Sequence, residues 1–179
     1  MDLESLQYPI GRFSWTGSTP ANREEWLRVV ESTPAELRKA VSGLDDAHLD
    51  TRYRPDGWTV RQVVHHYADD HMNSYIRFKL ALTEDSPTVI AYSEPAWGDL
   101  EDARTGPVEP SLTLLTGLHQ RWVAAWRGLA PEQWQRTFVH PRSGKAISIE
   151  QLAAMYAWHG RHHVAQIVAL RTRNGWAQA

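Results

Sequence analysis

The chain has no cysteine among its 179 residues and a formal net charge of only −2. Disulfides, a cysteine nucleophile and a thiolate zinc site are therefore excluded, and any metal must be bound by nitrogen and oxygen atoms. The near-neutral charge lacks the basic excess of proteins that bind nucleic acids or anionic membranes. No apolar run approaches the roughly 20 residues that span a bilayer, and the N-terminal residues lack the pattern of a signal peptide. We expect a cytoplasmic protein without nucleic acid or membrane partners.

The first of four long periodic segments runs from about Asn22 to Leu44. Its apolar residues recur at alternating steps of three and four, as on one buried face of a helix. Residues 33–36 have the pattern of a capping box, with Pro34 at the first helical position. The pattern therefore predicts a kink or a restart of this helix at Pro34, and Gly43 is the expected terminator.

Three further segments have the same period, and two of them begin with capping boxes at residues 59–62 and 148–151. We expect helices from Thr59 to Thr83, from Ser111 to Leu129, and over residues 148–175. On the third segment, the predicted inner face consists of Leu115, Leu118, Trp122, Ala125 and Leu129. The four helices predict an all-α, antiparallel four-helix bundle, with residues 1–179 forming a single domain.

Two connections stand out between these helices. Residues 86–110 contain several prolines and no clear period, so we expect a long loop, and loops of this length are often functional. Within it, Tyr92, Glu94 and Trp97 are candidates for the wall of a pocket, because a large aromatic side chain in a loop needs some burial. Residues 142–144 have turn chemistry and predict a small hairpin before the last helix.

Histidines are concentrated in the second and last helices. In the last helix, His159 and His163 continue an apolar seam, whereas His162 points to its flank. The pair lies one turn apart, with Cβ atoms about 6 Å from each other, so both imidazoles can reach one metal ion. Two core histidines satisfied by hydrogen bonds are the alternative, and this helix alone does not decide between the two. A glutamate zinc-protease motif is excluded, because Gly160 stands at the glutamate position.

A third metal ligand is expected from the second helix, which offers His65, His66 and His71. His66 shares a face with Asp70, whose carboxylate could accept the second ring N–H of a ligating histidine, and this favours His66 modestly. His71 is interpreted as an ordinary packed or surface histidine. His119, on the third helix, borders the apolar face, and packing is favoured over a role in the site.

Several segments together resemble the DinB/YfiT-like family of helical bundles over nearly the whole chain: PIGRF, VVHHYADDHMNSYIRFKLALTED, FVHPRSGKAISIEQL and YAWHGRHHVAQI. The resemblance is greatest to the YfiT branch, described as metal-dependent hydrolases and including bacillithiol S-transferases. That family holds zinc or nickel with one histidine of the second helix and an HxxxH pair of the last helix. These positions correspond to His66, His159 and His163. The last helix reads HHVAQ where many members have HHRGQ, a departure outside the ligands.

The resemblance implies a metal-dependent enzyme, and we expect a hydrolase with a small-molecule substrate and a divalent transition metal, zinc before nickel. Three histidine ligands leave an open coordination position for water or substrate. A thiol S-transferase that joins bacillithiol or a similar low-molecular-weight thiol to electrophiles is one alternative, and a non-catalytic metal-binding bundle is another. No catalytic residue is assigned, although Asp70 is a candidate beside the ligands. A homodimer is left open.

Overall fold

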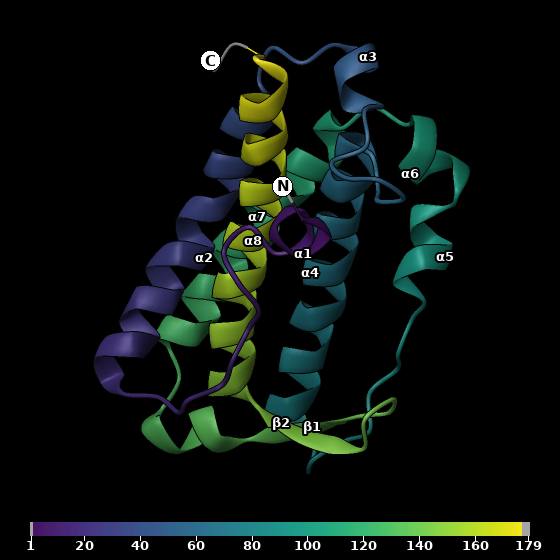
Figure 1. Ribbon diagram of the computed structural model, residues 1–179. Helices are drawn as coiled ribbons and strands as arrows, with labels where there is room; N and C mark the ends of the chain where they lie inside the picture. The colour runs from purple at the N-terminus through teal and green to yellow at the C-terminus, as the bar shows by residue number, and fades with distance from the viewer. Residues whose placement is uncertain (1, 177–179) are drawn as a thin grey trace.

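Four long helices dominate a computed structural model of the protein, which describes residues 2–176 (Figure 1). They are α2 (Pro20–Val41), α4 (Val60–Thr83), α7 (Glu109–Arg127) and α8 (Ile149–Asn174). The predicted all-α, four-helix bundle is confirmed. Over residues 2–176, no helix combines the length and the apolar character needed to cross a membrane.

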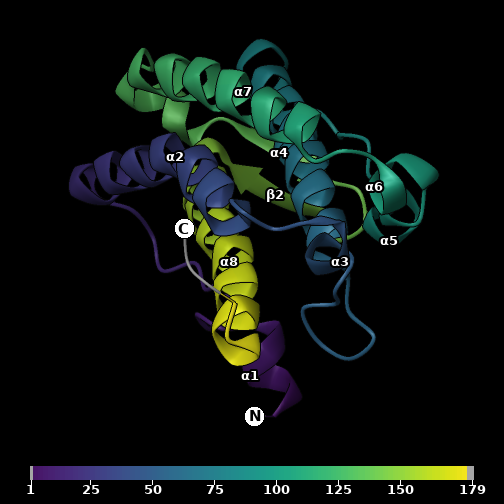
Figure 2. The same ribbon diagram turned by 90° about the horizontal axis from the view of Figure 1, so that it is seen from above.

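The order of the helices around the bundle differs from their order along the chain. Helix α2 packs against α7 and α8, and α4 packs against the same two helices. Seen from above, α2 and α4 therefore occupy opposite corners (Figure 2). In Figure 1, α2 and α8 run upward and α4 and α7 run downward, so α4 is antiparallel to α8 but parallel to α7. The long connection between α4 and α7 makes this possible, because it returns the chain to the top of the bundle.

That connection is not the structureless loop expected from the sequence. It contains two short helices, α5 (Glu94–Gly98) and α6 (Glu101–Thr105), which lie along α4. The hydroxyl of Ser93 caps α5, and the side-chain amide of Gln62 in α4 donates to the carbonyl of Gly98 at 2.7 Å. Helices this short lack a clear sequence period, and their contacts with α4 hold them in place.

Smaller elements lie at the two ends of the bundle and, in the case of α1 (Leu3–Gln7), beside the middle of α8 (Figure 1). They are α1, α3 (Asp46–Leu49), the 3₁₀ helix η1 (Pro131–Gln135), β1 (Thr137–His140) and β2 (Lys145–Ser148). The strands pair antiparallel, with Phe138 opposite Ile147, so the predicted hairpin is confirmed. The expected helix ends are also confirmed where local chemistry sets them: Thr59 and Gln62 form a capping box, and Gly175 ends α8 at φ +66°.

Of the kink or restart predicted at Pro34, the restart is wrong, and the kink stays a prediction. Helix α2 begins earlier, at Pro20, with Thr19 as its cap, and continues through Pro34 to Val41. The Thr33 hydroxyl does not cap a new helix, because it donates to the carbonyl of Val30 at 3.2 Å. Proline has no N–H for that same carbonyl, which would be its partner in a regular helix. The carbonyl of Val30 is therefore available to other donors.

Two apolar clusters fill the bundle, and a polar layer separates them. The lower cluster includes Trp122, Trp126 and Ile149, and the upper one includes Leu37, Val64 and Ile167. On α8 the buried residues of the lower cluster end at Ala157 and those of the upper cluster begin at Ile167. The interval between them carries His159 and His163, so the histidines lie in the middle of the core.

Candidate metal centre

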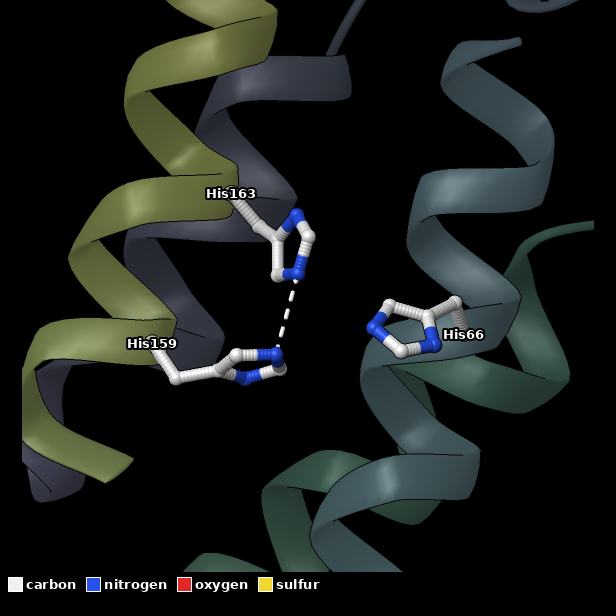
Figure 3. A group of neighbouring side chains, drawn as sticks. All are labelled: His66, His159 and His163. Carbon is white, nitrogen blue, oxygen red and sulfur yellow. Dashed lines mark hydrogen bonds between the residues drawn. The ribbon is translucent and has the colours of Figure 1, made fainter. Parts of the chain in front are cut away.

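Three histidines from two helices meet in the polar layer. His66 comes from α4 and His159 and His163 come from α8, and each offers one nitrogen atom within 4.8 Å of the other two. Figure 3 shows the three rings facing a common point between the helices. The Nε2 atoms of His159 and His163 are 3.1 Å apart. Two nitrogens bound to one tetrahedral zinc ion lie about 3.3 Å apart, so the spacing of this pair fits a shared ion.

The hydrogen bonds of His163 show which of its nitrogens carries the proton. The side-chain amide of Gln166 donates to the backbone carbonyl of Gln7 at 2.9 Å, which fixes the orientation of the amide. Its Oε1 atom then faces Nδ1 of His163 at 2.9 Å. An amide oxygen can only accept, so His163 donates through Nδ1 and keeps a lone pair on Nε2. That lone pair points toward His159, as a metal ligand requires.

Burial keeps all three rings neutral at neutral pH. Removal from water lowers the pKa of His159 to about 4, against the opposing charge of Asp70. Burial also lowers the pKa of His66, and it lowers that of His163 well below the usual value. Neutral imidazole is the form that binds metals. The donor set therefore fits a divalent transition ion, and imidazole nitrogen suits zinc, nickel and iron alike.

Asp70 lies beside the three histidines, but not in the expected hydrogen bond with His66. Its Oδ1 atom accepts from the Tyr92 hydroxyl at 2.9 Å and its Oδ2 atom accepts from the Tyr156 hydroxyl at 2.8 Å. The same Oδ2 atom is 3.6 Å from Nε2 of His159. Burial raises the pKa of Asp70, but His159, which is protonated in the acidic range where Asp70 titrates, the charge of His66 and the two hydroxyl donors outweigh burial and leave the pKa lowered. Asp70 is therefore an anion at neutral pH.

Aromatic side chains border this site on the α5 side. The ring of Trp58 lies 4.4 Å from that of His66, centroid to centroid, and the ring of Trp97 lies 4.5 Å from that of Tyr92. Trp97 is 36% exposed, so part of its surface faces solvent. Glu94, the third residue predicted for the wall, forms an ion pair with the hairpin. Tyr92 reaches the ligands through Asp70, and Trp97 covers Tyr92.

The structure separates His66 from its neighbour His65. The ring of His65 points away from the three-histidine group, toward the start of α7. Its Nδ1 atom is 2.8 Å from the hydroxyl of Ser111 and its Nε2 atom is 3.3 Å from the carbonyl of Gly106. Of the histidines in α4, only His66 joins the group that could hold an ion within the described residues.

Comparison with known proteins agrees with this architecture. The sequence pattern of the DinB superfamily matches residues 30–167. The chain belongs to the DinB superfamily. It is 47% identical over 178 residues to the Bacillus subtilis protein named "Putative metal-dependent hydrolase YfiT", covering 99% of this chain and 100% of that one. A Bacillus mycoides protein of the same description is 48% identical over 175 residues, with 97% and 100% covered.

A solved DinB structure has the same fold. YfiT from Bacillus subtilis, described as "a probable metal-dependent hydrolase with an unusual four-helix bundle topology", superposes with a TM-score of 0.95 at 47% identity. The match covers 97% of this chain and 99% of that one. The diagonal placement of α2 and α4 is thus shared with a DinB relative.

Two further histidines of this DinB bundle are linked to the group, and the sequence did not reveal the link. His71 is fully buried, and its Nε2 atom is 3.1 Å from Nδ1 of His159. His119 is also buried and lies in the middle of the face of α7 that packs against the other helices. Leu118, which we predicted on that inner face, is only partly buried. The position of His71 four residues after the buried Tyr67 was the one local signal that it faces the core.

Proposed function

We propose that this DinB protein is a metal-dependent hydrolase of small molecules, with the ion held by His66, His159 and His163. The observation that carries the proposal is the convergence of three neutral imidazoles from α4 and α8, with their nitrogen atoms within 4.8 Å of one another. A divalent transition ion bound there, zinc before nickel, would supply a Lewis acid and lower the pKa of a water molecule in its open position.

Asp70 is our candidate for the general base. Its carboxylate is anionic, and two tyrosine hydroxyls hold it in one orientation. The Oδ2 atom, 3.6 Å from Nε2 of His159, is close enough to the ligands to accept a proton from a water molecule beside them. A positioned base of this kind typically contributes about 10²–10⁴-fold to the rate. The carboxylate has lone pairs beyond the two that the tyrosines use.

Thiol S-transfer is the second candidate, because aromatic rings border the site. Trp58 and Trp97 offer apolar surface of the kind that binds an organic cosubstrate. A coordinated cation would stabilise a thiolate in the same way as it stabilises hydroxide. Such a reaction needs the ion and a place for the thiol, but no protein base strong enough to deprotonate water.

Turnover with and without thiol separates the two candidates. Ester and amide substrates are supplied to the zinc- or nickel-loaded protein, first alone and then with a low-molecular-weight thiol and an electrophile. If the protein is a hydrolase, we expect turnover without thiol, and we expect the rate to fall about 10²–10⁴-fold in Asp70→Asn. The matched control is Asp69→Asn, which removes the neighbouring carboxylate and should retain most of the activity.

Other outcomes reject the hydrolase. Turnover that requires thiol and survives Asp70→Asn would assign the protein as a transferase. If the zinc- or nickel-loaded protein turns over neither set of substrates, the protein is a non-catalytic metal-binding bundle.

A further inference from the structure

A line of hydrogen bonds crosses the bundle and ends on one of the three site histidines. It begins at the backbone carbonyl of Val30 in α2, which lies 2.6 Å from Nδ1 of His119 in α7. Nε2 of His119 is 2.9 Å from Nδ1 of His71 in α4, and Nε2 of His71 is 3.1 Å from Nδ1 of His159 in α8. His71 is 0% exposed and His119 is 1% exposed. All four long helices thus contribute to one buried relay.

The direction of every hydrogen bond in the relay follows from its first member. A carbonyl oxygen can only accept, so His119 donates through Nδ1, and in a neutral ring its Nε2 must then accept. His71 consequently donates through Nδ1 and accepts through Nε2. The donor for that last bond is Nδ1 of His159. One proton on each ring satisfies the whole line, and Nε2 of His159 is left with a free lone pair.

Pro34 explains why the Val30 carbonyl can anchor the relay. In a regular helix this carbonyl would accept from the backbone N–H of residue 34, which proline lacks. His119 fills the vacant position, together with the Thr33 hydroxyl at 3.2 Å. The proline inside α2 therefore has a role that its helix alone does not reveal.

We propose that His71 and His119 are positioning residues of the metal centre, which hold His159 in the tautomer that presents Nε2 to the ion. This inference rests on the proposed metal site. Ligating histidines commonly donate their second N–H to a carboxylate, a carbonyl or water, and losing such a partner costs about 10–100-fold in metal affinity. Here the acceptor for His159 is Nε2 of His71. That nitrogen is unprotonated because His71 donates to His119, which in turn donates to the backbone carbonyl of Val30. Gln166 fixes the tautomer of His163 in the same way: its side-chain oxygen accepts from Nδ1 of His163, and its amide nitrogen donates to the carbonyl of Gln7.

The test compares two substitutions of His119. His119→Leu removes both the donor and the acceptor, whereas His119→Gln keeps an amide donor for the carbonyl and an oxygen acceptor for His71. We expect zinc affinity to fall about 10–100-fold in His119→Leu and to remain within about threefold of wild type in His119→Gln. His65→Leu, which removes a histidine outside the relay, is the matched control and should bind zinc normally.

Nitrogen-15 NMR of the metal-free, folded protein gives a readout that does not depend on zinc. We expect His71, His119 and His159 all to carry their proton on Nδ1 in wild type, and His159 to become a mixture of tautomers in His119→Leu. An Nε2–H tautomer of His159 in wild type, or an unchanged zinc affinity in a folded His119→Leu variant, would overturn the inference. Wild-type protein that shows the three Nδ1–H tautomers but binds neither zinc nor nickel would overturn the proposed function instead, and leave the tautomer assignment standing.

Discussion

Nε2 of His159 and Nε2 of His163 face each other across 3.1 Å in the middle of the bundle core. The relay and Gln166 assign the ring protons to Nδ1 in both residues, so two lone pairs point at the same small space. Two facing lone pairs repel each other unless a cation lies between them. A third imidazole, that of His66, approaches the same space from α4. Burying three such nitrogen atoms without a partner would cost free energy, whereas a bound metal ion would satisfy all of them.

Metal binding should distinguish the two adjacent histidines of α4. His66→Ala removes one of three nitrogen donors, and we expect zinc affinity to fall by more than about 100-fold, beyond the loss typical of an indirect contact. His65→Ala should keep full affinity, because the ring of His65 bonds to the start of α7. Isothermal titration of both variants with zinc checks this. A larger loss in His65→Ala than in His66→Ala would refute the assignment.

The hydroxyl of Tyr92 should affect the acid limb of the activity profile. It donates to Oδ1 of Asp70 and thereby lowers the pKa of that carboxyl. Tyr92→Phe removes the donor, so the pKa of Asp70 rises and the base is lost at a higher pH as the solution is acidified. The kcat/KM profile should therefore shift its acid limb to higher pH, while Tyr75→Phe, on the same helix as Asp70, should leave it unchanged. A profile of Tyr92→Phe that superposes on wild type would exclude Asp70 as the base.

Gly160 should be needed for packing, although it lies in a helix. An added Cβ would collide with the hydroxyl oxygen of the fully buried Tyr67 and lie 3.0 Å from Cγ2 of Thr33. We expect Gly160→Ala to lower the free energy of unfolding by about 1–3 kcal/mol, as overpacking does. Gly117→Ala in α7 is the control: nothing lies within 4 Å of its added Cβ. It should raise stability by about 0.5–1 kcal/mol, since alanine favours helices. Chemical denaturation measures both, and equal effects would contradict the packing argument.

The metal-free protein should lose stability in mild acid. Burial lowers the pKa of His119 and of His159 to about 4, whereas both titrate near 6.5 in an unfolded chain. Between these values the unfolded chain binds more protons, so the free energy of unfolding falls as the pH decreases. From pH 7 to pH 5.5 the loss should be about 1 kcal/mol for each of the two groups. Urea denaturation at a series of pH values checks this, and a flat profile over that range would show that the histidines are not buried as neutral rings.

The sequence predicts the long helices well, because their signals are local. Thr59 and Ser148 cap helices within three residues of themselves, and Gly175 ends α8 by its own backbone conformation. The restart expected at Pro34 is wrong for the opposite reason. Its local pattern indicates a new helix, but a continuous helix is compatible with the lost hydrogen bond because a histidine 89 residues away contacts the Val30 carbonyl.

The candidate ligands were more predictable than their surroundings. His159 and His163 share a helix face by spacing alone, and the family resemblance selected His66. The partners of Asp70 and His71 could not be read from spacing, because they are set by tertiary packing. Tyr156 contacts Asp70 across 86 residues, and His119 and His159 contact His71 across 48 and 88 residues. A diagonal arrangement of α2 and α4 decides which helix faces meet, and no local pattern encodes it.

Metal content decides whether His66, His159 and His163 hold an ion. The protein is purified without an affinity tag, incubated with zinc or nickel, freed of unbound metal and measured by elemental analysis. We expect about one divalent transition ion per chain, and none in a folded His159→Ala, His163→Ala double variant. Wild-type protein that retains no metal after both ions have been supplied, or a double variant that retains as much as wild type, would refute the three-histidine site.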